Sequence, residues 1–297
     1  QSIDAATIYD VPKLMKEEQL DKVVLKKLGL SHTGEADITN WEEFVYHLNN
    51  PKHTVDIALV GKYVELKDSY KSISESFIHT SSFSRCKVNL HWICSEKLDA
   101  ASAIESLKNM DGVLVAPGFG PRGIEGKLYA VKYARENKIP FFGICLGMQA
   151  SVIEYARNVL HYDSAHSTEM NPESSYPVID IMEAQKRVTN MGGTMRLGSC
   201  ACELKKGSIA HAVYGADRID ERHRHRYEFN NLYLNDFENS GMIATGINPE
   251  TGLVEIVEIP SHPWFVGVQF HPEYKSTVAH PHPLFVSFVK AALKNKS

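Results

Sequence analysis

Short apolar segments alternate with segments of helical periodicity along the middle of the chain. Residues 55–61 form a mostly apolar run that ends in glycine, which predicts a buried strand, and residues 70–83 predict the helix after it. The further predicted elements are strands over residues 88–94, 112–116 and 139–144 and helices over residues 101–110, 127–136 and 148–160. Strands that alternate with helices predict an α/β fold, with a mostly parallel open sheet flanked by helices on both faces.

The two ends of the chain have different patterns. Residues 1 to about 50 are polar and helix-prone, with short amphipathic helices predicted over residues 11–15 and 20–28 and a linker after them. After about residue 175 the pattern is richer in strands. These strands are predicted over residues 177–182, 198–204, 242–247, 254–259 and 264–270, before a closing helix over residues 282–292. We therefore expect an N-terminal part, residues 1–52, and a main domain, residues 53–297, whose C-terminal part is strand-rich.

Composition excludes several functional classes. The chain has 297 residues, 43% of them hydrophobic, which is enough to bury a proper core. A formal net charge of −4 gives no indication of binding to nucleic acid or to a membrane surface. No apolar stretch approaches the roughly 20 residues needed to span a bilayer, and the first residues show no signal-peptide pattern. We expect a protein that binds neither nucleic acid nor membranes.

The cysteines indicate a reducing, cytoplasmic setting. There are five, and their spacing matches no disulfide framework. Cys200 and Cys202 lack a second pair of ligands, so two unrelated thiols on or near a strand are favoured over a zinc site. His280 and His282, on either side of a proline, are interpreted as a surface turn. We expect no metal site.

Residues 143–147, Gly-Ile-Cys-Leu-Gly, are the most informative stretch of the chain. They follow a predicted strand and precede a predicted helix, which is the setting of a nucleophile elbow. Glycines on either side allow a tight turn and close packing of the strand on the helix. The sulfur of Cys145 would lie near the N-terminus of that helix, where the thiolate is favoured.

A base for this cysteine is found far downstream. His271 and Glu273 follow the apolar run over residues 264–270, and residues two apart in an extended segment point the same way. Glu273 could then orient the imidazole of His271. Cys145, His271 and Glu273 would form the set of nucleophile, base and orienting carboxylate that acyl transfer requires.

A glycine-rich loop over residues 117–120 follows the strand predicted over residues 112–116. Sites in open α/β sheets lie outside the carboxyl ends of the strands, where Cys145 is also expected. The loop can present backbone N–H groups to an oxyanion, together with the amide of Leu146. Because Pro117 has no N–H group, the donor must be Gly118 or a later residue.

These motifs resemble a known family. Residues 143–149 and the His-Pro-Glu motif at residues 271–273 resemble the class I (triad) glutamine amidotransferases. Other segments narrow the resemblance to the glutaminase half of the CTP synthase family, and the similarity runs essentially from end to end. These segments are residues 61–66, 134–137, 167–169, 192–198 and 221–228, of which the last two are the most specific.

The resemblance implies a role for each matching residue. It implies Cys145 as nucleophile, His271 as general base and acid, and Glu273 as the orienting carboxylate. It also implies an oxyanion hole formed by the amides of Gly118 and Leu146. The residues implied to bind L-glutamine are Gly118, Leu146, Gly147, Met148, Gln149, Glu169 and Arg226, with Glu169 suited to the α-ammonium group and Arg226 to the α-carboxylate.

Regulation is implied by the same resemblance. Residues 120–126 resemble the family's mobile lid, which is linked to allosteric activation by GTP; Arg122 and Gly123 lie in it. Arg196 and Arg224 fall in segments tied to that activation or to the interface with the synthetase domain. Lys62 and Tyr63, at a strand end, are interpreted as shaping the lid region.

In the family, an N-terminal synthetase domain binds ATP, magnesium and UTP. This sequence has no G-x-x-x-x-G-K-[S/T] motif, and residues 1–52 resemble the tail of that domain and the interdomain linker. The resemblance implies that this piece needs no cofactor and hydrolyses glutamine to glutamate and ammonia. The ammonia would pass to the synthetase domain of the same enzyme, which makes CTP from UTP in pyrimidine biosynthesis. Family members form homotetramers and filaments.

Two other interpretations stay open. The chain could be the glutaminase of another triad enzyme, such as GMP synthetase, or a γ-glutamyl hydrolase, although residues 192–198 and 221–228 argue against this. It could also be an assembly or regulatory fragment that is inactive without the synthetase domain. His223 and His225 lie in a basic run that is ordinarily a solvated loop, and their role is left undecided.

Overall fold

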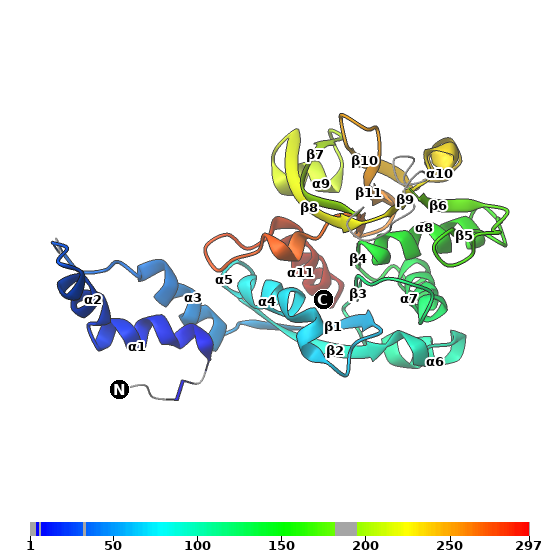
Figure 1. Cartoon of the computed structure of the whole chain (residues 1–297). Helices are drawn as coiled ribbons and strands as arrows, with labels where there is room; N and C mark the ends of the chain where they lie inside the picture. The colour runs from blue at the N-terminus through cyan, green and yellow to red at the C-terminus, as the bar shows by residue number, and fades with distance from the viewer. Residues whose placement is uncertain (1–3, 6, 32–33, 182–194, 297) are drawn as a thin grey trace.

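A computed structural model of the chain describes residues 4–5, 7–31, 34–181 and 195–296. Helices at the N-terminus project from a larger body in which helices surround a twisted sheet (Figure 1). These first elements are the 3₁₀ helix η1 (Ile8–Asp10) and the helices α1 (Val11–Glu17), α2 (Leu20–Leu28) and α3 (Thr39–Asn49). Residues 192–194, the start of one family-specific segment, lie outside the described residues.

The helix α3 was not expected, since residues after 28 were interpreted as a linker. Its apolar residues are Trp41, Phe44, Val45 and Leu48, which lie on one face at helical spacing. Together with Tyr9 they form a small cluster that also contacts Ile78 of the main body. The sequence did not indicate this helix, because the polar composition of the segment conceals its short apolar stripe.

One sheet of nine strands forms the core of the described main body, in the order β2-β1-β3-β4-β12-β11-β10-β7-β8. The first five of these strands are mutually parallel, and the remaining pairings are antiparallel. The strand bounds are β1 His53–Gly61, β2 Cys86–Cys94, β3 Gly112–Val115, β4 Phe141–Ile144, β7 Arg196–Leu204, β8 Arg218–His225, β10 Ile243–Ile247, β11 Val254–Glu258 and β12 Phe265–Val268. The α/β prediction with a strand-rich C-terminal part is confirmed.

Helices cover both faces of the sheet because alternate strand residues point to opposite faces. In β1, Ala58 and Val60 pack on one side, while Ile57 and Leu59 pack on the other. The first face is covered mainly by α6 (Ala100–Leu107), α7 (Ile124–Glu136) and α8 (Leu146–Asn158). The second face is covered by α4 (Lys71–His79), α9 (Ile209–Tyr214) and α11 (Pro283–Lys296).

Smaller elements complete the described structure. A three-stranded sheet has the order β5-β6-β9. The remaining bounds are β5 His166–Ser167, β6 Pro177–Ile181, β9 Tyr227–Phe229, α5 Ser81–Ser84, α10 Leu234–Ser240, and the 3₁₀ helices η2 Lys67–Tyr70, η3 Ser95–Lys97, η5 Asn231–Tyr233 and η6 Pro272–Tyr274. None of the described helices is both long and apolar enough to cross a bilayer.

The basic run around residue 223 is strand β8, not a solvated loop. Exposed and buried residues alternate along it, and the buried ones are Ile219, Glu221, His223 and His225. The period of two was present in the sequence, but polar residues occupy most of the inward positions, so apolarity did not mark the strand. His282 is likewise buried, against Glu221 and Tyr214, so its interpretation as part of a surface turn was wrong.

We predict that Gly126→Ala destabilises the fold. A Cβ atom on Gly126 would lie 1.8 Å from the backbone oxygen of Ser95, where α7 packs on η3. Overpacking of this kind costs about 1–3 kcal/mol, and the helix preference of alanine offsets only about 1 kcal/mol. Urea denaturation should show the loss, with Lys132→Ala on the same helix as a control that changes little. An unchanged midpoint for Gly126→Ala would contradict this close packing.

Candidate active site

Cys145 lies at the carboxyl end of β4, in the turn that leads directly into α8. Its φ of +52° and ψ of −105° are uncommon for a residue with a side chain. The backbone N–H of Cys145 donates to Val268 of β12 at 2.7 Å, which fixes the turn to the neighbouring strand. The predicted elbow is therefore present, with the thiol at the start of a helix.

The two glycines of the elbow permit a very close approach of backbone. A Cβ atom on Gly143 would lie 2.7 Å from the oxygen of Gly147. One on Gly147 would lie 2.1 Å from the oxygen of Val115, at the end of β3. Any side chain at either position would push α8 away from β3 and β4 and displace Cys145.

His271 and Glu273 lie together beyond the end of β12. The His271 Nδ1 and Glu273 Oε1 atoms are 2.7 Å apart, and both side chains are buried. The backbone N–H of His271 donates to Arg222 of β8 at 2.8 Å. The segment is not extended as expected, because Pro272 starts the 3₁₀ helix η6. The pairing was predicted correctly, but a tight turn produces it.

The charge on His271 is set by its neighbours. Burial lowers the pKa of His271, but interactions with Cys145 and Glu273 outweigh burial and raise that pKa. Nδ1 contacts Glu273, whereas the buried Nε2 atom has no hydrogen-bond partner among the described residues. The raised pKa favours the imidazolium form of His271, whose positive charge stabilises a nearby anion.

A small cavity beside Cys145 brings together most of the predicted binding residues. It is lined by Gly118, Phe119, Cys145, Gln149, Glu169, His225, Arg226 and Tyr227, and its volume is about 10 Å³. The side chains of Leu146 and Met148 pack in the hydrophobic core instead, although the Leu146 side chain lies close to Gly118. The loop after β3 therefore faces the thiol, as expected for an oxyanion loop.

Gln269 is a site residue that the sequence analysis missed. Its Nε2 atom lies 3.6 Å from the sulfur of Cys145, and its Oε1 atom accepts from Gln149 Nε2 at 3.1 Å. The same Gln149 nitrogen also donates to the carbonyl of Tyr227 at 2.9 Å. The sequence did contain a signal for this residue, because Gln269 is the one polar residue in the apolar run over residues 264–270.

The four residues that the resemblance links to activation occupy different environments. Arg122 lies over the ring of Tyr63 and 3.3 Å from Glu96, and Gly123 is the N-cap of α7 with a φ of +73°. The guanidinium of Arg224 lies over Phe119 at 6.0 Å. Arg196 instead points into the protein, 2.7 Å from Glu255. Arg122 and Gly123 thus lie within the lid segment, and Arg224 contacts Phe119 just before it.

Buried polar side chains of the antiparallel strands surround Arg196. Burial lowers the pKa of His223 to about 2 and that of His225 to about 3. Burial also raises the pKa of Glu255 to about 7 and that of Glu228 to about 8, although Arg196 opposes both shifts. The two histidines are therefore neutral near pH 7, with His223 Nδ1 and His225 Nε2 2.8 Å apart.

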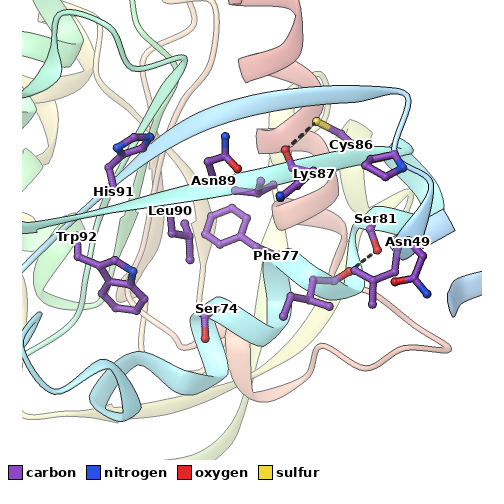
Figure 2. Close-up of a pocket in the computed structure, with 14 residues that line it drawn as sticks. Asn49, Ser74, Phe77, Ser81, Cys86, Lys87, Asn89, Leu90, His91 and Trp92 are labelled. Carbon is purple, nitrogen blue, oxygen red and sulfur yellow. Dashed lines mark hydrogen bonds between the residues drawn. The ribbon is translucent and has the colours of Figure 1, made fainter. Parts of the chain in front are cut away.

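No group of three potential metal ligands occurs among the described residues. Cys200 and Cys202 lie on β7 as free thiols, and Cys202 is fully buried. A groove of about 750 Å³ lies elsewhere, between the edge strand β2 and the helices α4 and α5. Figure 2 shows Phe77, Leu90 and Trp92 along it, and none of the residues around Cys145 reaches it.

Comparisons with known proteins agree with this geometry. The family described as "Glutamine amidotransferase class-I" matches residues 65–291. The glutaminase domain of the Trypanosoma brucei CTPS, solved with bound acivicin, is 40% identical with a TM-score of 0.77. That match covers 81% of this chain and 94% of the solved domain. The chain belongs to the class I glutamine amidotransferases.

Curated relatives in this family are CTP synthases. The protein of Christiangramia forsetii is 63% identical over 292 residues, which is 98% of this chain and 54% of that protein. The protein of Bacteroides fragilis is 56% identical over 293 residues, which is 99% of this chain and 55% of that protein. The chain thus spans about half the length of the curated relatives it matches. These matches confirm the resemblance found in the sequence. They also confirm the prediction that the chain is an enzyme of the glutamine amidotransferase type.

We predict that Glu273→Gln lowers the pKa of His271. The carboxylate stabilises the imidazolium and an amide does not, so the pKa should fall by about one pH unit or more. Titration of the His271 ring by NMR would measure this, with Glu250→Gln, an exposed carboxylate outside the site, as the control. An unchanged titration in Glu273→Gln would show that the 2.7 Å contact does not tune the base.

Proposed function

We propose that Cys145, His271 and Glu273 hydrolyse L-glutamine to glutamate and ammonia through a γ-glutamyl thioester. The observation that carries this proposal is the buried set of a thiol on a strained elbow, an imidazole whose pKa the thiol raises, and a carboxylate 2.7 Å from that imidazole. His271 takes the thiol proton, and the sulfur attacks the carboxamide carbon. His271 then gives a proton to the leaving ammonia and later activates the water that releases glutamate.

The amides of Gly118 and Leu146 are the proposed oxyanion donors. Leu146 is the first residue of α8, so its N–H group is one of those left free by the helix. Gly118 lies on the facing loop, within contact distance of the Leu146 side chain. A preorganised donor of this kind commonly contributes about 3 kcal/mol to the stabilisation of the transition state.

Glutamine itself is bound, in this proposal, by Gln149, Glu169 and Arg226, with backbone contacts from residues 146–148. The cavity of about 10 Å³ holds about one water molecule, so glutamine enters only when the loop over residues 118–120 moves. At present Glu169 accepts a hydrogen bond from the N–H group of Gly120 at 2.8 Å. The α-ammonium group of glutamine would replace that N–H as the partner of Glu169.

For the longer protein we propose the reaction of the curated relatives, CTP formation from UTP with ATP, magnesium and the ammonia released here. Residues 1–52 are then the end of the synthetase domain and the linker. Helices α1 and α2 bury no residue of their own and expose Val23 and Leu28, which supports a partner surface elsewhere in that protein or its homotetramer.

We further propose that GTP activates the enzyme through the lid residues Arg122 and Gly123 and through Arg224. Arg196 would take part less directly, because its side chain points into the protein. Five free thiols support a cytoplasmic location.

We predict that Cys145→Ala abolishes glutamine hydrolysis and labelling by 6-diazo-5-oxo-norleucine. The analogue alkylates an activated thiol in a glutamine site, so mass spectrometry should map one adduct, on Cys145, that glutamine suppresses. Turnover should fall by about 10³-fold or more. Cys94→Ala, a partly exposed thiol outside the site, should behave like the parent chain. Label on another residue, or turnover retained in Cys145→Ala, would contradict the proposal.

A further inference from the structure

Lys127 is a fully buried lysine on the α7 face that packs behind the oxyanion loop. Its Nζ atom donates to the backbone carbonyl of Ala116 at 2.5 Å. Lys62, at the end of β1, is also buried, and its Nζ atom donates to the carbonyl of Phe119. The two lysines therefore hold the carbonyl groups at either end of the segment over residues 116–119.

These contacts determine how the loop presents its amides. The N–H and C=O groups of a trans peptide point in opposite directions. Because the Phe119 carbonyl is turned toward Lys62, the N–H of Gly120 points the other way, where it donates to Glu169. At the other end the Ala116 carbonyl is held by Lys127, and the following Pro117 has no N–H. The Gly118 amide lies between two fixed peptides.

Stability does not explain a lysine at this position. Among the described residues no carboxylate contributes to the pKa shift of Lys127, and a buried cation without a counter-ion is costly. Burial and the charge of Lys62 together lower the pKa of Lys127 to about 7. Cys145 is the ionisable neighbour that raises it. An apolar side chain of the same length would fill the space without that cost.

We propose that Lys127 is a positioning residue for the reaction at Cys145: it holds the oxyanion loop through the Ala116 carbonyl and places a positive charge beside the thiolate, with Lys62 holding the other end of the loop. This inference rests on the proposed function. The ionisable groups that interact with the Lys127 charge are Lys62, beyond the end of β1, and Cys145, on the elbow. The shape of the loop then depends on both lysines, and the charge near the thiol depends on Lys127.

The test compares Lys127→Met with Lys132→Met, a partly exposed lysine one turn further along α7. The pH profile of iodoacetamide alkylation at Cys145, followed by peptide mass spectrometry, reports the thiolate even without turnover. We expect Lys127→Met to move the half-maximal rate to higher pH, to lower kcat about tenfold with KM nearly unchanged, and to leave Tm equal or higher. Lys132→Met should match the parent chain in all three readouts.

A merely structural lysine predicts the opposite set of results. Lower Tm with an unchanged alkylation profile, or no change in either readout, would overturn the inference. If Lys127→Met does not fold, Lys62→Met provides a second test, since freeing the Phe119 carbonyl should also lower kcat. Turnover that survives in Cys145→Ala would refute the proposed function, whereas an active parent with an unaffected Lys127→Met would refute only the role of Lys127.

Discussion

The close approach of three backbone segments at Cys145 is the constraint on which the site depends. The ends of β3 and β4 and the start of α8 meet where a Cβ atom on Gly143 or Gly147 could not fit. That contact forces Cys145 into a left-handed turn, at the expense of local backbone energy. The same contact places the thiol at the N-terminus of α8 and opposite the loop that follows β3. The position of Cys145 relative to the loop after β3 therefore follows from this backbone packing.

The two halves of the sheet make different contributions. The parallel half supplies carboxyl ends of strands, where Cys145, the oxyanion loop and His271 converge, as expected for open α/β sheets. The antiparallel half supplies a wall with unusually polar buried side chains. Gln149 contacts Gln269 beside the thiol and the carbonyl of Tyr227, which lies in β9 of the small sheet, directly after β8 of the wall. Displacement of that wall would move His225, which lines the cavity beside Cys145.

Sequence reasoning succeeded where apolar pattern and special residues agree. The elbow, the pairing of His271 with Glu273 and the parallel core follow from glycines, strand runs and motif order. It failed where polarity hides periodicity: β8 was missed because His223, His225 and Glu221 take the inward positions. Gln269 was missed although it is the one polar residue in its apolar run, and Lys127 was missed because it is one of several charged residues of α7. Their positions become meaningful only when distant segments are brought together.

The central claim is that the hydrolysis of glutamine proceeds through a γ-glutamyl thioester on Cys145. The direct measurement is rapid acid quenching of the chain during turnover of glutamine, followed by mass spectrometry of its peptides. The account predicts a γ-glutamyl group on the peptide that contains Cys145, at an occupancy that rises when the hydrolysis step is slowed. A γ-glutamyl group on any other residue, or steady release of ammonia with no acylated enzyme at any quench time, would contradict it.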